Sequence, residues 1–300
     1  PNLKRVVDKT MMFSARSGLV VCVVLLSVVK SDAWWCDGHV LTAAIAERNM
    51  CPEAKNATDM MVAQLAPEYP KATTFMQAAC WPDDLKSDRD NFFDTWHYIN
   101  LPFIRTPVGM ALTAVNTEHN VVWALAQANK TLRANRAAPV DQAMKLFFMI
   151  HFAGDVHQPL HAITEYSVAH PPPDGDNGGN LFRILGQNVS ELHAFWDSGA
   201  GQWQTDINRP MAANDTDYIN TWADTITNKV PESSVADRVA ETDPNVWANE
   251  SYMLGVTVGY PPQENTTLPP EFITTAQETA IVQVAVGGYR LLKNLKDIYF

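Results

Sequence analysis

The 300-residue sequence is poor in cysteine and in basic side chains, and each shortage excludes a class of protein. It has four cysteines and no Cys-x-x-Cys pair, which excludes the cysteine-rich cages of most structural zinc sites. It has 22 lysines and arginines against 33 aspartates and glutamates, a formal charge of −11. This balance argues against a protein that grips nucleic acid along a broad basic groove. After residue 33 no apolar run is long enough to cross a bilayer, so this part of the chain is expected to be soluble.

Residues 11–33 have the pattern of a secretory signal peptide. A basic residue precedes a short apolar stretch, residues 18–29, and small residues lead to a cleavage position after Ala33. Met11 or Met12 is the expected start of translation. Cleavage would remove five basic and two acidic side chains, so the mature chain is expected to be secreted and more acidic than the precursor.

Residues 34–300 are expected to form one domain. No repeat, low-complexity tract or change of composition marks a boundary within them, and their length suffices for a substantial core. Three of the cysteines fall in this part, and an oxidising compartment favours one disulfide and one free thiol among them, with the pairing left open. Six sequons predict N-glycans at Asn56, Asn129, Asn188, Asn214, Asn249 and Asn265.

Apolar residues at spacings of three and four predict helices, whereas strand-like alternation is scarce. Only residues 180–185 suggest one arm of a short β-hairpin. The sequence therefore predicts an all-α fold, a single mainly helical domain with a short hairpin. The predicted helices are 39–48, 118–136, 142–157, 218–228 and 274–295.

The segment His151-Phe-Ala-Gly-Asp155-Val-His-Gln-Pro159-Leu-His161 carries the strongest chemical signal. His151 and Asp155 are four residues apart, so on a helix they share a face and can bind one metal ion. Pro159 cannot continue that helix, and the resulting bend can direct His161 to a second ion. Imidazole nitrogens mixed with carboxylate oxygens suit Zn²⁺.

The same spacing recurs in His193-Ala-Phe-Trp-Asp197. In a chain of this composition, about half of one His-x-x-x-Asp pair is expected by chance. Either pair alone is therefore explained equally well by a metal site or by a hydrogen-bonded core histidine and a surface acid. Further candidates strengthen the metal reading. Trp34 would become the first residue after cleavage, so its α-amine and carbonyl could chelate a metal together with His39.

Two more candidate ligands follow. Asp83 comes directly after Cys80-Trp-Pro, and His97 lies among aromatic residues in Asp-Thr-Trp-His97-Tyr-Ile-Asn, where a buried imidazole needs a partner. Taken singly, each is more readily a hydrogen-bonded structural residue.

As an ordered set these residues resemble the zinc-dependent class I single-strand nucleases, the family of mung bean nuclease and the trypanosomatid 3′-nucleotidase/nucleases. The resemblance runs from the N-terminal Trp34 to the closing Gly287-Gly-Tyr-Arg-Leu-Leu292 helix. It implies a phospholipase C/nuclease-like helical domain with a trinuclear zinc cleft, acting as a monomer on single-stranded DNA or RNA and on 3′-nucleotides. The motifs that carry it are Trp-Pro-Asp83-Asp, His97-Tyr-Ile-Asn100, His151 to His161, Gly178-Gly-Asn180 and Leu-His193 to Asp197.

The resemblance also implies a role for each residue. Lys86 matches a position near the catalytic centre, together with Asp83 and Asp155. Tyr98 matches an aromatic residue that stacks on a base, and Asn180 a polar residue at the substrate rim. Asn100 is a departure, since the fungal members carry Asp at this position. This difference puts in doubt any role for a carboxylate here in orienting the attacking water. The implied zinc ligands are Asp83, His97, His151 and Asp155 for the first ion, His161, His193 and Asp197 for the second, and Trp34, His39 and the bridging Asp155 for the third.

Zinc lowers the pKa of bound water towards neutrality and so suits hydrolysis of phosphate esters. Two alternatives remain open at this point. A zinc phospholipase C is expected to carry Glu at the last ligand position, where this chain has Asp197. A non-catalytic secreted glycoprotein could hold zinc structurally, although such sites are usually closed and rich in cysteine.

Overall fold

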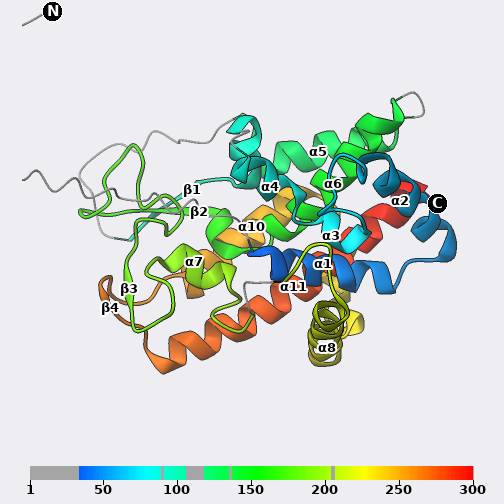
Figure 1. The fold of residues 1–300 in the computed structure, drawn as a ribbon. Coiled ribbons are helices and arrows are strands. Elements are labelled where there is room, and N and C mark those ends of the chain that lie inside the picture. The colour runs from blue at the N-terminus through cyan, green and yellow to red at the C-terminus, as the bar shows by residue number, and fades with distance from the viewer. Residues whose placement is uncertain (1–33, 89–90, 106–117, 135–136, 204–206, 300) are drawn as a thin grey trace, which may run out of the picture. The chain divides into compact units, whose positions relative to one another are not determined.

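The computed structural model describes residues 34–88, 91–105, 118–134, 137–203 and 207–299. The predicted signal peptide, residues 11–33, and the ten residues before it lie outside them. The described part is a mainly helical single domain, which confirms the predicted fold class (Figure 1). Within it, no helix is both long and apolar enough to cross a membrane.

The five predicted helices are present, with different ends. The helix predicted at 218–228 begins at Ala213, because the Asp215 carboxylate accepts a hydrogen bond from the Ala212 N–H and closes the first turn. The described helices are α1 (Cys36–Arg48), α2 (Pro52–Leu65), α3 (Phe75–Ala78), α4 (Trp81–Ser87), α5 (Val121–Leu132), α6 (Pro139–Asp155), α7 (Leu192–Asp197), α8 (Ala213–Lys229), α9 (Ala236–Ala240), α10 (Pro244–Leu254) and α11 (Pro270–Tyr299), with the shorter turns η1 (Asn91–His97), η2 (Pro159–His161), η3 (Glu232–Val235) and η4 (Gly255–Gly259).

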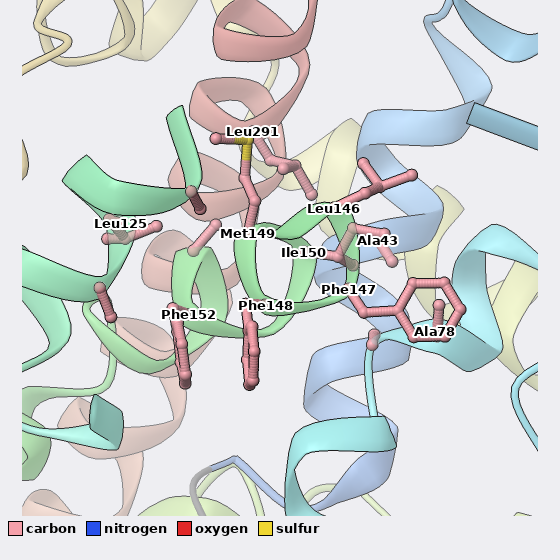
Figure 2. Close-up of a cluster of buried hydrophobic side chains, with 14 of the residues drawn as sticks. Ala43, Ala78, Leu125, Leu146, Phe147, Phe148, Met149, Ile150, Phe152 and Leu291 are labelled. Carbon is pink, nitrogen blue, oxygen red and sulfur yellow. The ribbon is translucent and has the colours of Figure 1, made fainter. Parts of the chain in front are cut away.

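Helix α6 lies at the centre of the largest core cluster. Pro139 at its first turn needs no hydrogen-bond partner for its nitrogen, which favours a helix start there. From Leu146 onwards the helix is buried on all sides, and it packs against α1, α2, α5 and α11. Figure 2 shows its side chains directed towards Ala43 of α1, Leu125 of α5 and Leu291 of α11.

The last turn of α6 breaks this apolar pattern. His151 and Asp155 are both fully buried there, although burial of a polar or charged side chain is costly unless a partner compensates it. The fold therefore places two ligand-type residues inside the core, and their partners must come from other elements.

The strands form two short parallel pairs. β1 (Leu101–Ile104) pairs with β2 (Ile163–Tyr166), and β3 (Ile184–Leu185) pairs with β4 (Thr266–Thr267). The hairpin expected from residues 180–185 is reduced to one antiparallel bridge between Arg183 and Glu191, because the strand itself turns to a distant partner. Alternation within six residues contains no information about a partner eighty residues away.

One disulfide joins Cys36 to Cys80, and Cys51 is free. The prediction of one disulfide and one free thiol is thus confirmed, and the pairing that the sequence left open is resolved. The bond connects the first residue of α1 to the residue before α4.

Candidate metal centre

Six elements bring the predicted ligand side chains together. Within the described residues, three groups of histidines and carboxylates have their potential ligand atoms within 4.8 Å of one another. Every member is buried. The groups are His39, Asp83 and His151; His97, His151 and Asp155; and His161, His193 and Asp197.

The Asp155 carboxylate lies between several imidazole rings. Its Oδ2 is 3.1 Å from Nδ1 of His97 and 3.2 Å from Nε2 of His151. Its Oδ1 is 3.3 Å from Nε2 of His39 and 3.9 Å from Nδ1 of His161. The two oxygens thus face different sets of nitrogens, which is the arrangement required of a carboxylate that bridges two cations.

The spacing around His97 and His151 fits a small tetrahedral ion. Nδ1 of His97 and Nε2 of His151 are 3.0 Å apart, and Oδ1 of Asp83 is 3.6 Å from each of them. Ligands at about 2.0–2.1 Å around a tetrahedral Zn²⁺ are separated by about 3.3 Å. Both oxygens of Asp155, Oδ1 of Asp83 and both ring nitrogens of His39 have no hydrogen-bond partner in the protein. Buried polar atoms are normally satisfied, so this cluster calls for a cation.

The second cluster gives an independent argument from tautomers. Nδ1 of His161 lies 2.6 Å from the His97 carbonyl, and Nδ1 of His193 lies 2.5 Å from the Gly178 carbonyl. A carbonyl oxygen only accepts, so both Nδ1 atoms carry the proton. The two Nε2 atoms face each other at 3.1 Å, and burial lowers the pKa of both rings, that of His193 to about 4. Two neutral rings therefore turn their lone pairs towards one point, as they would around a metal ion.

Charge favours a cation near Asp155 as well. Burial opposes ionisation, but the charge on His151 and the nearby imidazole rings of His39 and His97 hold the pKa of Asp155 well below its usual range. Conversely, burial lowers the pKa of His151, but Asp155 and Asp83 outweigh it and raise this pKa to about 9. The Nδ1 of His151 donates to the Ala79 carbonyl over 2.6 Å, which directs Nε2 towards the carboxylates.

Trp34 is buried beside this cluster. Its indole Nε1 donates to the carbonyl of Gly154 over 3.0 Å, and the next residue, Trp35, donates its N–H to the Asp197 carbonyl over 3.0 Å. Gly154 also faces the ring of His39, because a Cβ built there would lie 2.7 Å from Nδ1 of His39. Residues 34 and 35 are thus held between α6 and α7.

The remaining predicted residues are Lys86, Tyr98, Asn100 and Asn180. Lys86 is buried, and its charge contributes to lowering the pKa of both His97 and His193, after burial. Tyr98 is half-buried, and burial raises its pKa. Asn100 is half-buried between η1 and β1, and the half-buried Asn180 follows Gly178 and donates to the Asn177 carbonyl.

Sequence reasoning missed several supporting groups. The carbonyls of Ala79, His97 and Gly178 orient three rings, and a backbone carbonyl has no sequence signal. Gln158 donates from Nε2 to Oδ1 of Asp197, and this glutamine was visible inside the motif without an assigned role.

Buried histidines and carboxylates in three overlapping groups define a candidate multinuclear metal centre within a helical domain. The chain belongs to the S1/P1 nuclease family, whose pattern it matches over residues 34–299. The protein is therefore a nuclease, a hydrolase that acts on ester bonds.

The alignments with curated relatives cover nearly the whole length of each relative. Endonuclease 5 of Arabidopsis thaliana is 26% identical over 300 residues, covering 93% of this chain and 96% of the relative. Endonuclease 3 of Arabidopsis thaliana is 26% identical, covering 96% of this chain and 97% of the relative. Nuclease P1 of Penicillium citrinum is 22% identical over 286 residues, covering 89% of this chain and 98% of the relative.

Proposed function

We propose that the protein is a secreted, zinc-dependent endonuclease and 3′-nucleotidase that hydrolyses the 3′ ester bonds of single-stranded nucleic acids and of 3′-mononucleotides. Its products from nucleic acids would carry 5′-phosphates. The observation that carries the proposal is the Asp155 carboxylate, whose two oxygens face different sets of ligand-type nitrogens within a family of nucleases.

Three zinc ions account for the groups of buried side chains. Asp155 would be shared between the first and third ions, since its Oδ2 faces His97 and its Oδ1 faces His39. The proposed ligands are Asp83, His97, His151 and Asp155 for the first ion, His161, His193 and Asp197 for the second, and Trp34 through its α-amine and carbonyl, His39 and Asp155 for the third.

Zinc bound here would supply Lewis acidity at phosphorus and a water of near-neutral pKa. The protein's own residues would hold the ions and balance the charge of the substrate phosphate. The buried Lys86 ammonium lies close enough to both histidine groups to lower the pKa of His97 and His193, so it is placed to neutralise a substrate phosphate between them. Asp83 faces His97 and His151, and its exposure is slightly greater than that of Asp155.

Tyr98 is the candidate base-stacking residue. It follows His97 directly, and because it is only half-buried, a splayed-out base could stack on its ring. Such stacking contributes about 1–3 kcal/mol per base and requires an unpaired base, which favours single strands. Replacement of Tyr98 by Ala should raise the Michaelis constant for single-stranded DNA and leave the zinc content unchanged. An unchanged Michaelis constant would exclude this role.

Release of product from three substrates separates the proposal from its alternatives. The purified protein is offered a 3′-mononucleotide, single-stranded DNA and phosphatidylcholine vesicles. Hydrolysis of the two nucleotide substrates alone supports the proposal. Cleavage of the phosphatidylcholine headgroup alone would identify a phospholipase C, and no turnover with full zinc occupancy would indicate a structural zinc glycoprotein.

Export and glycosylation form part of the same proposal. The Cys36–Cys80 disulfide suits an oxidising compartment, which the signal-peptide pattern of residues 11–33 also predicts. Five of the six sequon asparagines are exposed, whereas Asn129 is half-buried and accepts a hydrogen bond from Arg133. Intact mass of the exported protein, before and after deglycosylation, would identify both the first residue and the glycans.

A further inference from the structure

Each cysteine of the disulfide precedes a candidate metal ligand by three residues. His39 comes three residues after Cys36, and Asp83 comes three residues after Cys80. Each ligand therefore lies about one helical turn beyond one sulfur, on the first turn of α1 or α4. Nε2 of His39 and Oδ2 of Asp83 approach to 3.9 Å. One covalent bond thus joins the bases of the two turns that bring these side chains together.

The same bond also supports His151. The residue before Cys80 is Ala79, whose carbonyl accepts the hydrogen bond from Nδ1 of His151. All three members of the His39, Asp83 and His151 group are therefore tied to the disulfide, two through their own helical turns and one through a neighbouring carbonyl.

Neither ligand-bearing turn is well fixed by local structure. α4 has only seven residues, and a helix of this length is marginal by itself. The residue before α1, Trp35, provides no side-chain hydrogen bond that caps the helix. Apart from the disulfide, α4 is held by the ion pair between Arg209 and Asp84, with distances of 2.6 and 2.7 Å, and by Trp81, which packs on the rings of α6. Neither of these contacts involves α1.

We propose that the Cys36–Cys80 disulfide positions His39 and Asp83 for metal binding, so that zinc occupancy and the redox state of this disulfide are linked. The inference rests on the proposed zinc site. If the disulfide raises zinc affinity by some factor, bound zinc must favour the disulfide over the dithiol by the same factor, because linkage is reciprocal. A disulfide that only stabilises the fold at a distance from the ions would show no such coupling.

The redox step is reduction by glutathione. Two glutathione thiols supply two electrons and two protons, the sulfur–sulfur bond between Cys36 and Cys80 breaks, two cysteine thiols form, and the two glutathiones are oxidised to their disulfide. Zinc is neither oxidised nor reduced in this step. Zinc shifts the equilibrium only because its affinity for the disulfide form differs from its affinity for the dithiol form.

The first experiment compares zinc binding by the parent, by Cys36→Ala/Cys80→Ala and by Cys51→Ala. Free zinc is set with a chelator buffer, bound zinc is measured by metal analysis, and circular dichroism confirms that each protein is folded at the chosen temperature. We expect the double variant to need about tenfold more free zinc for at least one ion. Cys51→Ala, which removes the free thiol only, should match the parent.

A folded double variant with the parent's zinc-binding curve, differing only in a lower melting temperature, would overturn the inference and leave the proposed function intact. A parent protein that binds no zinc would instead contradict the proposed function itself. The two failures are therefore distinguishable.

The second experiment needs no variant. The disulfide of the parent is equilibrated in glutathione buffers at free zinc concentrations well below and well above saturation, and the reduced fraction is determined by alkylation and mass. A tenfold linkage should shift the reduction midpoint by about 30 mV to more reducing values when zinc is saturating. An unchanged midpoint, or a shift in the opposite direction, would contradict the inference.

Discussion

The Nε2 of Gln158 donates a hydrogen bond to Oδ1 of Asp197 over 2.7 Å, and both side chains are fully buried. The amide orientation is fixed, because Oε1 of Gln158 accepts from the N–H of Leu160 and a backbone N–H can only donate. Oδ2 of Asp197 then remains to face Nε2 of His193 at 3.6 Å. One amide thus connects the turn that carries His161 to the helix that carries Asp197.

Replacement of Gln158 by Glu should weaken zinc binding at the second site. The carboxylate can still accept from Leu160, but it cannot donate to Asp197 and adds a like charge next to it. Loss of such a supporting hydrogen bond typically costs about 10–100-fold in metal affinity. Zinc titration in a chelator buffer measures the change. Gln202→Glu, which breaks hydrogen bonds to the Gly199 and Gln277 carbonyls, is the matched control, and an equal loss of zinc there would refute the specific role.

Gly154→Ala should displace His39. A Cβ at this position would lie 2.7 Å from Nδ1 of His39, and the ring cannot retreat because it stacks on His151 with centroids 3.8 Å apart. Overpacking of this kind costs about 1–3 kcal/mol, and we expect a lower free energy of unfolding together with reduced zinc content.

The control for this prediction is Gly259→Ala. A Cβ there would approach nothing closer than the flexible end of Leu160, at 3.3 Å. Chemical denaturation and metal analysis of both variants decide the outcome. A Gly154→Ala protein with the parent's zinc content would show that His39 does not need this close approach.

Asp155→Asn should be more damaging than Lys86→Ala. The carboxylate proposed as the bridge faces three rings within 3.3 Å, so loss of its charge should release at least one zinc ion and lower activity by more than about 100-fold. Lys86→Ala should leave the zinc content unchanged and lower activity less. Steady-state kinetics and metal analysis test both statements, and a fully loaded, active Asp155→Asn protein would refute the bridge.

Asp176 should make stability depend on pH. Burial raises its pKa to about 6 from 3.8, while its Oδ1 accepts from the Glu165 N–H. The protonated form therefore stabilises the fold below about pH 4, and this contribution is lost as pH rises through about 6. Two pKa units correspond to roughly 2–3 kcal/mol.

Asp176→Asn cannot ionise and keeps the acceptor oxygen. The difference between the free energy of unfolding of this variant and that of the parent should therefore rise by roughly 2–3 kcal/mol, in favour of the variant, from pH 4 to pH 7.5. Asp174→Asn, on an exposed part of the same loop, should leave the parent's pH dependence unchanged. Parallel pH profiles for the parent and Asp176→Asn would contradict the buried-carboxyl account.

Four of the candidate ligands were predictable from local spacing, whereas Asp83 and His97 were assigned through the family resemblance. His151 and Asp155 are one turn apart on a helix whose apolar pattern is strong, and His193 and Asp197 repeat that spacing. The helices at 39–48, 142–157 and 274–295 were visible for the same reason. Helix α2 was missed because Asn, Thr and Asp dilute its apolar positions.

The features that could not be predicted from the sequence depend on contacts between residues far apart in the chain. Cys36 pairs with Cys80 rather than Cys51 because of how α1 packs on α3, which leads to Cys80, and Ile184 pairs with Thr266 across eighty residues. The roles of Gly154 and Gln158 likewise exist only once α1 and α7 lie against the end of α6. Local periodicity does not encode these contacts.

The most direct test of the trinuclear account is the zinc content of the exported protein that begins at Trp34, determined together with its activity. The account predicts about three zinc ions per chain, loss of activity on chelation and recovery with zinc. The same chain with one extra residue before Trp34 should fold, retain about two ions and lose most activity, because the third site uses the α-amine. Full activity of the Trp34 protein with no bound metal would contradict the account.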